Sequence, residues 1–323
     1  MATAYLSPLD CASLLSKKRK GRRRRGTKAA GAASIAQDAT DGVLARASCL
    51  GTGQNALVIA VRLNPKNEDA KRALWHLSRD TPDEAATFFD SFAETFDANL
   101  ERIGYRVPQL VGRALAAHVE AVRAGVPFGT TLDAGCGTGL VGPHLRPLTS
   151  GALVGVDLSP KMLEHASQRT HAGTAVYNTL VAQDLVSLQR AHVLKGSSTL
   201  PLTEGFELVV AADVLVYFGE LTAAFTAFVR LSSATSLLIF TCERPKIGEA
   251  VPLGFDKSQD TGRFVHTKSY VVSAAAAAGG YRLLTYREEV LRYEGGEPVD
   301  GHLFIFSRGA ARIGSGELET GRL

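Results

Sequence analysis

The stretch Thr131-Leu-Asp-Ala-Gly-Cys-Gly-Thr-Gly-Leu140 decides the fold of this chain. Residues Phe128 to Leu132 supply a predicted buried strand that leads into the turn, and apolar residues at helical spacing follow it. Alternating glycines let the backbone turn sharply and approach a ligand where a Cβ would collide. The start of the helix then presents free N–H groups to whatever is bound. This order of features predicts a ligand-binding turn at the end of a strand.

From residue 128 onward, strand and helix patterns alternate, which is typical of a parallel sheet covered on both faces. We expect strands near 128–133, 152–157, 174–180, 207–212 and 236–242, and helices near 139–147, 160–171, 185–194 and 219–231. After a loop at 243–262 come a helix at 267–278 and strands at 281–291 and 302–307, which no helix separates. The predicted fold is α/β: a seven-stranded, Rossmann-like doubly wound sheet, mostly parallel with an antiparallel last strand, preceded by a helical segment.

Four acids stand at or just beyond the ends of successive expected strands: Asp133, Asp157, Asp184 and Asp213. The carboxyl ends of the strands form the binding crevice of a doubly wound sheet, so we expect these acids to line it. Each acid also has an ordinary interpretation as a helix cap, and Asp157 is followed by Ser159, which is itself a cap candidate.

These motifs resemble the class I S-adenosylmethionine-dependent methyltransferases over about residues 85–308. The resemblance implies that the glycine turn wraps the methionine part of S-adenosyl-L-methionine, that Asp157 accepts the two ribose hydroxyls, and that Asp184 meets the adenine amino group. A carboxylate suits a diol because it accepts two hydrogen bonds. By the same resemblance, Ala212 and Asp213 lie under the sulfonium. The implied cofactor-binding residues are Asp133, Gly135, Cys136, Gly137, Gly139, Asp157, Leu158, Asp184, Leu185 and Ala212.

Four further segments look like a bacterial-type group of predicted methyltransferases that often carry tetratricopeptide repeats: 89–97, 104–108, 263–270 and 292–299. This chain keeps only about one repeat-like helix pair, near 51–84, where a stable array needs about three. A helical hairpin is therefore the simpler interpretation of that segment. The next helix carries Phe88, Phe89, Phe92 and Phe96, which are expected in the core but also stand where a helix could close over the ligand.

The candidate catalytic residues are Asp213, Tyr217 and His266, all expected near the strand ends, where they would position the methyl acceptor. His302 is a weaker candidate, and a packed or surface role is the ordinary alternative for either histidine. Methyl transfer by direct displacement needs a general base only when the acceptor does not ionise on its own. The resembled family uses an Asn-Pro-Pro-Tyr type element for amide and base nitrogens, and none follows the fourth strand here, which makes DNA and glutamine methylation less expected. A small-molecule or protein acceptor is the expected partner.

Two other functions stay open. The sequence Gly137-Thr-Gly139-Leu-Val-Gly142 satisfies the dinucleotide fingerprint of a nicotinamide dehydrogenase, with Asp157 at a suitable distance. Asp133 and Asp184 argue against that assignment. A non-catalytic protein that keeps the fold and the cofactor is the other alternative, since fold does not settle function.

The net charge of +4 combines two regions of opposite sign. Residues 1–37 hold nine Lys or Arg and one acid, so they carry +8, and the remaining 27 basic and 31 acidic residues carry −4. The tail is rich in Ala, Ser and basic residues, which is typical of an organellar transit peptide for a plastid or mitochondrion. A nuclear-import or nucleic-acid-binding arm, or a solvated tail in a cytoplasmic protein, are the alternatives.

The expected organisation is a disordered basic tail (1–50), a helical hairpin (51–84), the methyltransferase-like domain (85–308) and a disordered C-terminal tail (309–323). The four cysteines lack metal-ligand spacing, so no metal site is expected. No apolar run is long enough to span a bilayer, and nucleic acid is not an expected partner of the folded domain. The oligomeric state has no signature in the sequence.

Overall fold

The computed structural model describes residues 82–194, 205–258 and 261–309. Contacts divide the chain after Glu84, and the second unit, Ala85–Leu323, holds nearly all of the described residues. The tail at 1–50, most of the expected hairpin at 51–84 and all but the first residue of the C-terminal tail lie outside them. The helices of this part of the chain are too short or too polar to cross a membrane.

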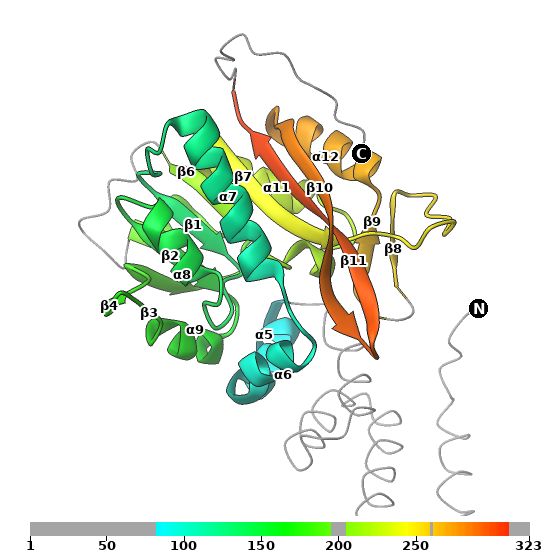
Figure 1. Cartoon of the computed structure of the whole chain (residues 1–323), viewed down its shortest axis with the longest axis horizontal. Helices are drawn as coiled ribbons and strands as arrows, with labels where there is room; N and C mark the ends of the chain where they lie inside the picture. The colour runs from blue at the N-terminus through cyan, green and yellow to red at the C-terminus, as the bar shows by residue number, and fades with distance from the viewer. Residues whose placement is uncertain (1–81, 195–204, 259–260, 310–323) are drawn as a thin grey trace, which may run out of the picture. The chain divides into compact units, whose positions relative to one another are not determined.

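One mixed sheet organises the domain, and the order of its seven main strands is β10-β11-β7-β6-β1-β2-β5 (Figure 1). These strands are β1 (Thr131–Ala134), β2 (Leu153–Asp157), β5 (Thr179–Ala182), β6 (Phe206–Ala211), β7 (Ser232–Glu243), β10 (Arg282–Glu294) and β11 (Glu297–Ser307). The five strands from β5 to β7 are parallel, and β11 runs antiparallel to both β7 and β10. The predicted Rossmann-like sheet with an antiparallel last strand is therefore confirmed.

Two short pairs of strands were not predicted. The expected loop at 243–262 contains β8 (Phe255–Lys257), which pairs with β9 (Phe264–His266), and β9 extends the main sheet beside Glu243 at the end of β7. A two-stranded ribbon, β3 (Thr170–His171) with β4 (Thr174–Ala175), lies between the helix at 160–167 and the strand at 179–182. The sequence predicted a helix up to residue 171 and a strand from residue 174 in its place. The expected strand at 174–180 consequently begins only at Thr179.

Most expected helices are present, and two are much shorter than predicted. The helices are α5 (Pro82–Phe92), α6 (Phe96–Arg102), α7 (Val107–Arg123), α8 (Gly142–Leu145), α9 (Pro160–Ser167), α10 (Arg190–Leu194), α11 (Thr222–Leu231) and α12 (Lys268–Gly279), with 3₁₀ turns η2 (Ala93–Thr95), η3 (Arg146–Leu148) and η4 (Leu215–Tyr217). The helix expected at 139–147 is reduced to α8 and η3 because Pro143 and Pro147 tolerate only the first turn of a helix.

The helix expected at 185–194 is reduced to α10, since residues 184–188 form a turn around the side chain of Asp184. Elsewhere the predicted caps form. Ser159 accepts a hydrogen bond from the Met162 N–H at 3.1 Å and caps α9, and Thr267 caps α12 in the same way.

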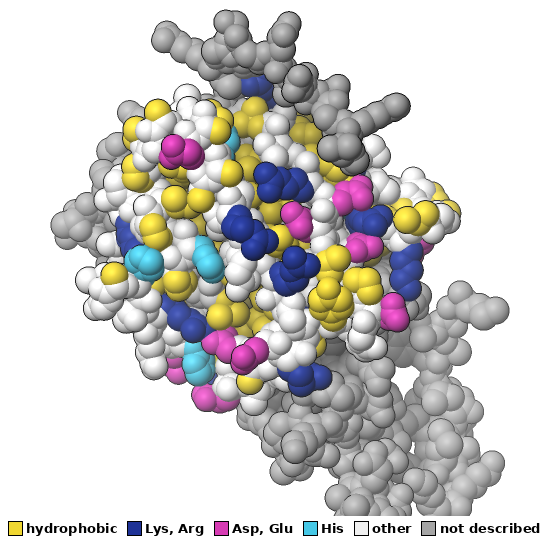
Figure 2. Space-filling model, in the orientation of Figure 1, with side chains coloured by type: hydrophobic (Ala, Val, Ile, Leu, Met, Phe, Trp, Pro, Cys, Tyr) yellow, Lys and Arg dark blue, Asp and Glu magenta, His cyan; other side chains and the backbone are white. Residues whose placement is uncertain are grey.

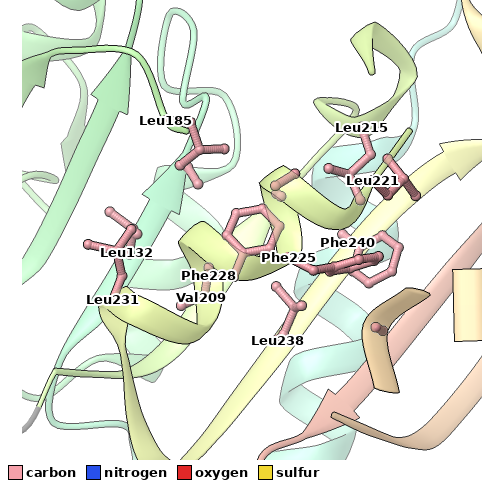
Figure 3. Packing of buried hydrophobic residues seen from close by; sticks show 14 of the residues in the cluster. Leu132, Leu185, Val209, Leu215, Leu221, Phe225, Phe228, Leu231, Leu238 and Phe240 are labelled. Atoms are coloured by element: carbon pink, nitrogen blue, oxygen red, sulfur yellow. The ribbon is translucent and has the colours of Figure 1, made fainter. Parts of the chain in front are cut away.

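Two hydrophobic clusters cover the two faces of the sheet. On one face, Phe225 and Phe228 of α11 are fully buried against Leu132, Val209 and Phe240 of three neighbouring strands (Figure 3). On the other face, α7 packs over the alternate residues of the same strands, and it crosses the front of the sheet in Figure 1. Both faces are thus buried, as the near-continuous apolar strands predict, and the carboxyl ends of the strands are left to carry polar groups.

Candidate active site

A row of acids crosses the carboxyl ends of five adjacent strands. In the order of the sheet they are Asp184 after β5, Asp157 ending β2, Asp133 in β1, Asp213 after β6 and Glu243 ending β7. Neighbouring strands lie about 4.8 Å apart, so the sheet holds these carboxylates side by side. The structure therefore brings together the four predicted acids and adds Glu243, which was not predicted.

The glycine turn has the left-handed backbone that only glycine adopts without strain. Gly135, Gly137 and Gly139 have φ of +72°, +53° and +82°. A Cβ on Gly135 would lie 2.5 Å from Cγ2 of Val214, so the turn packs directly on the segment that follows β6. The Gly135 and Cys136 N–H groups donate to the Val156 carbonyl at 2.7 and 2.9 Å, which anchors the turn to β2.

Asp157 connects this turn to the next helix. Its two carboxylate oxygens accept hydrogen bonds from the Gly137 N–H at 2.8 Å and the Ser159 N–H at 2.9 Å. Burial raises the pKa of Asp157, and these backbone donors oppose the rise. Because a carboxylate has about four lone-pair sites, each oxygen still has capacity for a ligand donor, which fits a vicinal diol. Leu158 is half-buried beside it.

Asp133 is almost fully buried and accepts a hydrogen bond from the Tyr177 hydroxyl at 2.7 Å. Burial raises the pKa of Asp133 to about 7, and the nearby charge of Asp157 adds to the rise, while the Tyr177 hydroxyl opposes it. Its Oδ1 is buried and accepts no hydrogen bond from any described residue. An orphaned buried oxygen inside a glycine turn fits a ligand that donates hydrogen bonds.

Asp184 is placed where predicted, but its side chain is engaged locally. Its two oxygens accept from the N–H groups of Val186 at 3.3 Å and Ser187 at 2.9 Å. The cap interpretation that the sequence left open thus describes its present contacts. Leu185 is buried in the core and Ala212 is half-buried at the end of β6.

Asp213 has an uncommon backbone conformation. Its φ of +60° lies in the left-handed region that non-glycine residues rarely adopt, at a cost of about 1–3 kcal/mol. Its N–H donates to Oγ1 of Thr241 at 2.9 Å, which holds the residue between β6 and β7. Tyr217 follows in η4, and its ring meets the ring edge of Phe89 at 5.4 Å. The structure therefore brings Asp213 and Tyr217 to the same end of the sheet.

A network of buried charges adjoins Asp213. Arg292 of β10 is fully buried, and its guanidinium contacts Oε1 of Glu243 through Nη2 and Oε1 of Glu294 through Nε at 2.7 Å. Arg263 donates to the same Glu294 oxygen at 2.7 Å. The Thr261 hydroxyl donates to the other oxygen of Glu243 at 2.8 Å. Asp213 lies 3.6 Å from Nη1 of Arg292.

Two short helices cover the glycine turn. Phe96 of α6 is the side chain nearest to where a Cβ on Gly137 would stand, at 3.8 Å. Asp97 accepts from the Thr138 hydroxyl of the turn and pairs with Arg169. Asp90 of α5 accepts from the Ser159 hydroxyl and, at 3.2 Å, from the Lys161 N–H. These contacts hold α6 on the glycine turn and α5 on the segment after β2, and closure of this helical segment over a ligand stays a prediction.

The histidines have packing roles in this structure. His266 is fully buried, its Nε2–H donates to the Gly219 carbonyl at 3.0 Å, and its ring stacks on Tyr270. Burial lowers the pKa of His266 to about 4. His302 donates to the His266 carbonyl, and burial lowers its pKa to about 4 as well. These contacts are those of the packing interpretation that the sequence left open, and the role of His266 in positioning an acceptor stays a prediction.

Residues 132–236 match the family model of a methyltransferase domain. The matched part, about a third of this chain, is similar to methyltransferase domains. Human methyltransferase-like protein 27 is 38% identical over 79 residues, which are 24% of this chain and 31% of that protein. The aligned part thus spans about a third of the curated relative.

Two solved structures are similar to this chain. Magnesium protoporphyrin IX methyltransferase from Synechocystis PCC 6803, with bound S-adenosylhomocysteine, is 19% identical, with a TM-score of 0.47, covering 68% of this chain and 97% of that one. An N-methyltransferase from Bradyrhizobium japonicum WM9, in complex with S-adenosyl-L-homocysteine, is 18% identical, with a TM-score of 0.42, covering 61% and 86%.

Sequence reasoning missed several residues that build this site, although the sequence held a signal for them. The missed residues include Tyr105, Tyr177, Thr138, Arg169, Asp90, Asp97, Glu243, Arg263, Arg292 and Glu294. Six of them stand in the four segments that carried the closer resemblance, 89–97, 104–108, 263–270 and 292–299. Those segments are distant in the sequence, and all of them contribute side chains to this end of the sheet.

Proposed function

We propose that this chain transfers a methyl group from S-adenosyl-L-methionine to a small-molecule or protein acceptor by direct displacement. The observation that carries the proposal is the left-handed glycine turn joined through its Gly137 N–H to the Asp157 carboxylate. A tight turn without a ligand needs neither three left-handed glycines nor a buried acid beside it. The matched methyltransferase domain supports the same assignment.

The residues present fit this cofactor. Asp157 would hold the ribose hydroxyls, and the glycine turn with Asp133 would hold the amino-acid part. When bound, S-adenosylmethionine supplies an electrophilic methyl carbon on a positively charged sulfur. The chain contributes placement, because the gain in such a reaction comes mostly from aligning the acceptor with that carbon. Phe89, Phe96 and Tyr217 would exclude water from this end of the sheet.

Calorimetric titration of the full chain with S-adenosylhomocysteine, and separately with NAD, tests the assignment. We expect S-adenosylhomocysteine alone to bind, with a Kd on the order of micromolar. Asp157→Asn should weaken it at least about tenfold, since the neutral side chain loses charge-assisted hydrogen bonds. Asp300→Asn, which changes a half-exposed acid paired with Arg244, is the matched control. Binding of NAD instead would show a dehydrogenase, and binding of neither would contradict the assignment.

Two finer proposals rest on the sequence alone. The basic tail at 1–50 would direct the chain to a plastid or mitochondrion, and the segment at 51–84 would be a remnant of a tetratricopeptide-like pair. Expression of the tail fused to a fluorescent protein checks the first. Organellar signal supports it, and nuclear signal would favour the import-sequence alternative.

A further inference from the structure

The ring of Tyr177 fills a space that three glycines leave behind the glycine turn. A Cβ on Gly139 of the turn would lie 2.9 Å from Cε2 of this ring, and a Cβ on Gly142 of α8 would lie 2.6 Å from its hydroxyl oxygen. A Cβ on Gly155 of β2 would lie 3.1 Å from its Cδ1. Because carbon atoms in contact stand about 3.5–4.0 Å apart, side chains at these positions would displace the ring. Gly142, which completed the dinucleotide fingerprint in the sequence, thus makes room for a tyrosine.

The hydroxyl of this ring holds one oxygen of Asp133. Gly155 lies opposite Asp133 in the register of β1 and β2, so no side chain of β2 stands between the carboxyl group and the ring. Tyr177 is 9% exposed and Asp133 is 1% exposed, and the hydroxyl donates to Oδ2 at 2.7 Å. Burial and the nearby charge of Asp133 raise the pKa of Tyr177, so the hydroxyl keeps its proton and stays a donor. This one contact fixes the rotation of the carboxyl group.

The other oxygen of Asp133 is left for a donor from outside the described part of the chain. Oδ1 is buried and accepts no hydrogen bond from any described residue, which is costly unless a ligand supplies the donor. The titratable groups around the carboxyl group are Tyr177, Asp157 of β2 and the Cys136 thiol of the turn, while Arg169 acts on Tyr177. On the other side of β1, β6 presents an apolar side chain. Acidic surroundings of this kind suit a positively charged donor.

We propose that Tyr177 is a positioning residue for the methyl donor: its hydroxyl holds Oδ2 of Asp133 and leaves Oδ1 to accept a hydrogen bond from the ammonium group of the donor's amino-acid part. The inference rests on the proposed function and deepens it. An ammonium group favours the charged form of a carboxyl group, so binding displaces a proton from Asp133 near neutral pH. The Tyr177 hydroxyl also favours the carboxylate and lowers the pKa of Asp133. Tyr177 therefore sets the pH range in which this ammonium group is held.

The test compares two ligands that differ only in the amino group, by calorimetry on the full chain. S-adenosylhomocysteine carries the ammonium group, and its deaminated analogue carries hydrogen in that place. We expect the wild type at pH 8 to bind S-adenosylhomocysteine at least about tenfold more tightly, as suits a charge-assisted hydrogen bond. Tyr177→Phe keeps the ring that packs on the glycines. At pH 7 it should reduce the preference about fivefold, because Asp133 without this donor ionises about one pH unit higher.

Proton release distinguishes positioning from packing. Titrations in two buffers of different ionisation enthalpy count the protons that leave the protein when a ligand binds. The wild type should release about half a proton with S-adenosylhomocysteine at pH 7, since the pKa of Asp133 is about 7, and none with the analogue. In Tyr177→Phe the profile of release against pH should move upward by about one pH unit. Tyr281→Phe, which removes a buried hydroxyl paired with Ser232, is the matched control and should change neither the preference nor the release.

A double-mutant comparison shows whether Tyr177 acts through Asp133. In the Asp133→Asn background, adding Tyr177→Phe should change the ratio of the two affinities by less than about twofold, because the group on which the hydroxyl acts is no longer charged. A fall in the ratio as large as that in the wild-type background would show that Tyr177 acts by another route, which contradicts the positioning role.

The outcomes separate this inference from the proposed function. Equal affinity of the wild type for the two ligands, or a preference and a proton release that Tyr177→Phe leaves unchanged, would overturn the role of Tyr177 while S-adenosylhomocysteine binding still supports a methyltransferase. Binding of neither ligand would overturn both. A general loss of stability in Tyr177→Phe would weaken both ligands together and would leave their ratio unchanged, which also contradicts the inference.

Discussion

Asp133 is a buried acid whose protonation links stability to ligand binding. Its pKa is about 7 in the folded chain, above the ordinary value of 3.8, mainly because of burial. Between pH 4 and pH 7 the folded chain therefore holds a proton that the unfolded chain has lost, so the free energy of unfolding falls as the pH rises through this range. Above the folded pKa, this contribution no longer changes with pH.

We predict that Asp133→Asn raises the free energy of unfolding at pH 8 by roughly 2–4 kcal/mol and changes it little near pH 4. The asparagine oxygen can still accept from Tyr177, and the neutral side chain avoids the cost of a buried charge. Urea unfolding at a series of pH values measures the effect. The curve of Asp300→Asn, which changes a half-exposed acid, should run parallel to that of the wild type. A parallel curve for Asp133→Asn would refute the assignment.

We also expect Asp133→Asn to bind S-adenosylhomocysteine more weakly at pH 8. Residues that serve binding often reduce the stability of the fold, so a gain in stability together with a loss of affinity would fit a role of Asp133 in the site. A variant that is both more stable and tighter-binding would show that Asp133 has no part in the site.

Residues that act on near neighbours in the sequence could be predicted, and residues that act across the sheet could not. Gly137 and Asp157 were predicted because each belongs to a local strand-turn-helix pattern, and the turn chemistry restricts the residue types. Arg292 and Glu243 are 49 residues apart, and their contact exists only because β10, β11 and β7 are neighbours in the sheet. Arg292 by itself reads as an ordinary polar residue of a strand.

At the scale of elements, α5 and α6 are attached to this end of the sheet by two aspartates seven residues apart. Asp90 binds the segment after β2, and Asp97 binds the turn and Arg169 of the segment after α9. The intervening 3₁₀ turn, η2, lets the two short helices lie over this end of the sheet. The sequence predicted a single helix with an apolar face. The spacing of apolar residues along a helix does not indicate which of its carboxylates bind residues from other parts of the fold.

We predict that Asp97→Ala loosens α6 without unfolding the domain. Asp97 is half-exposed, so its pair with Arg169 is worth no more than about 1 kcal/mol. Backbone amides at 96–104 should exchange faster with deuterium, and S-adenosylhomocysteine should bind a few-fold more weakly because binding must then order the helix. Glu101→Ala, on the exposed side of the same helix, is the control. Unchanged exchange in Asp97→Ala would show that Phe96 packing alone holds α6.

Element boundaries differed from prediction where a side chain competed with the helix. Pro143 and Pro147 limit α8, and the Asp184 cap delays α10. The strand β8 falls inside the loop predicted at 243–262 because Phe255–Lys257 is too short for a period to show, and no element was predicted at β9. Its role becomes visible only in the sheet, where β9 supplies the segment that carries Arg263 beside Glu243.

At the scale of the molecule, the strand order separates two groups of side chains along the carboxyl ends of the strands. The residues expected to bind the cofactor lie at one end of this row, and the network of buried charges lies at the other end. Asp157 and the glycine turn belong to β2 and β1, while Glu243 and Arg292 belong to β7 and β10. Asp213 after β6 stands between them. Because β11 runs antiparallel to both β7 and β10, the carboxyl end of β10, which carries Arg292, lies at the same end of the sheet as the carboxyl ends of the parallel strands. Residues late in the sequence therefore contribute side chains to the same end of the sheet as Asp157 and the glycine turn.

Charge is also divided at this scale, since the first 37 residues carry +8 and the remainder −4. The face of the folded domain in Figure 2 shows acidic side chains among the basic ones. We therefore predict that polyanion binding belongs to the tail. The full chain should be retained on heparin, and the salt needed to elute it should drop sharply when the nine Lys and Arg of residues 1–37 are changed to Gln.

The matched comparison changes nine other Lys and Arg, chosen among exposed residues of the folded domain, to Gln in the same way. These changes make an already negative region more negative, so elution should shift much less than with the tail variant, whose basic run is not interrupted by acids. If the salt needed for elution falls in the domain variant and not in the tail variant, the folded surface itself binds the polyanion. A nucleic acid would then have to be considered as the methyl acceptor, against the absence of an Asn-Pro-Pro-Tyr element after β6.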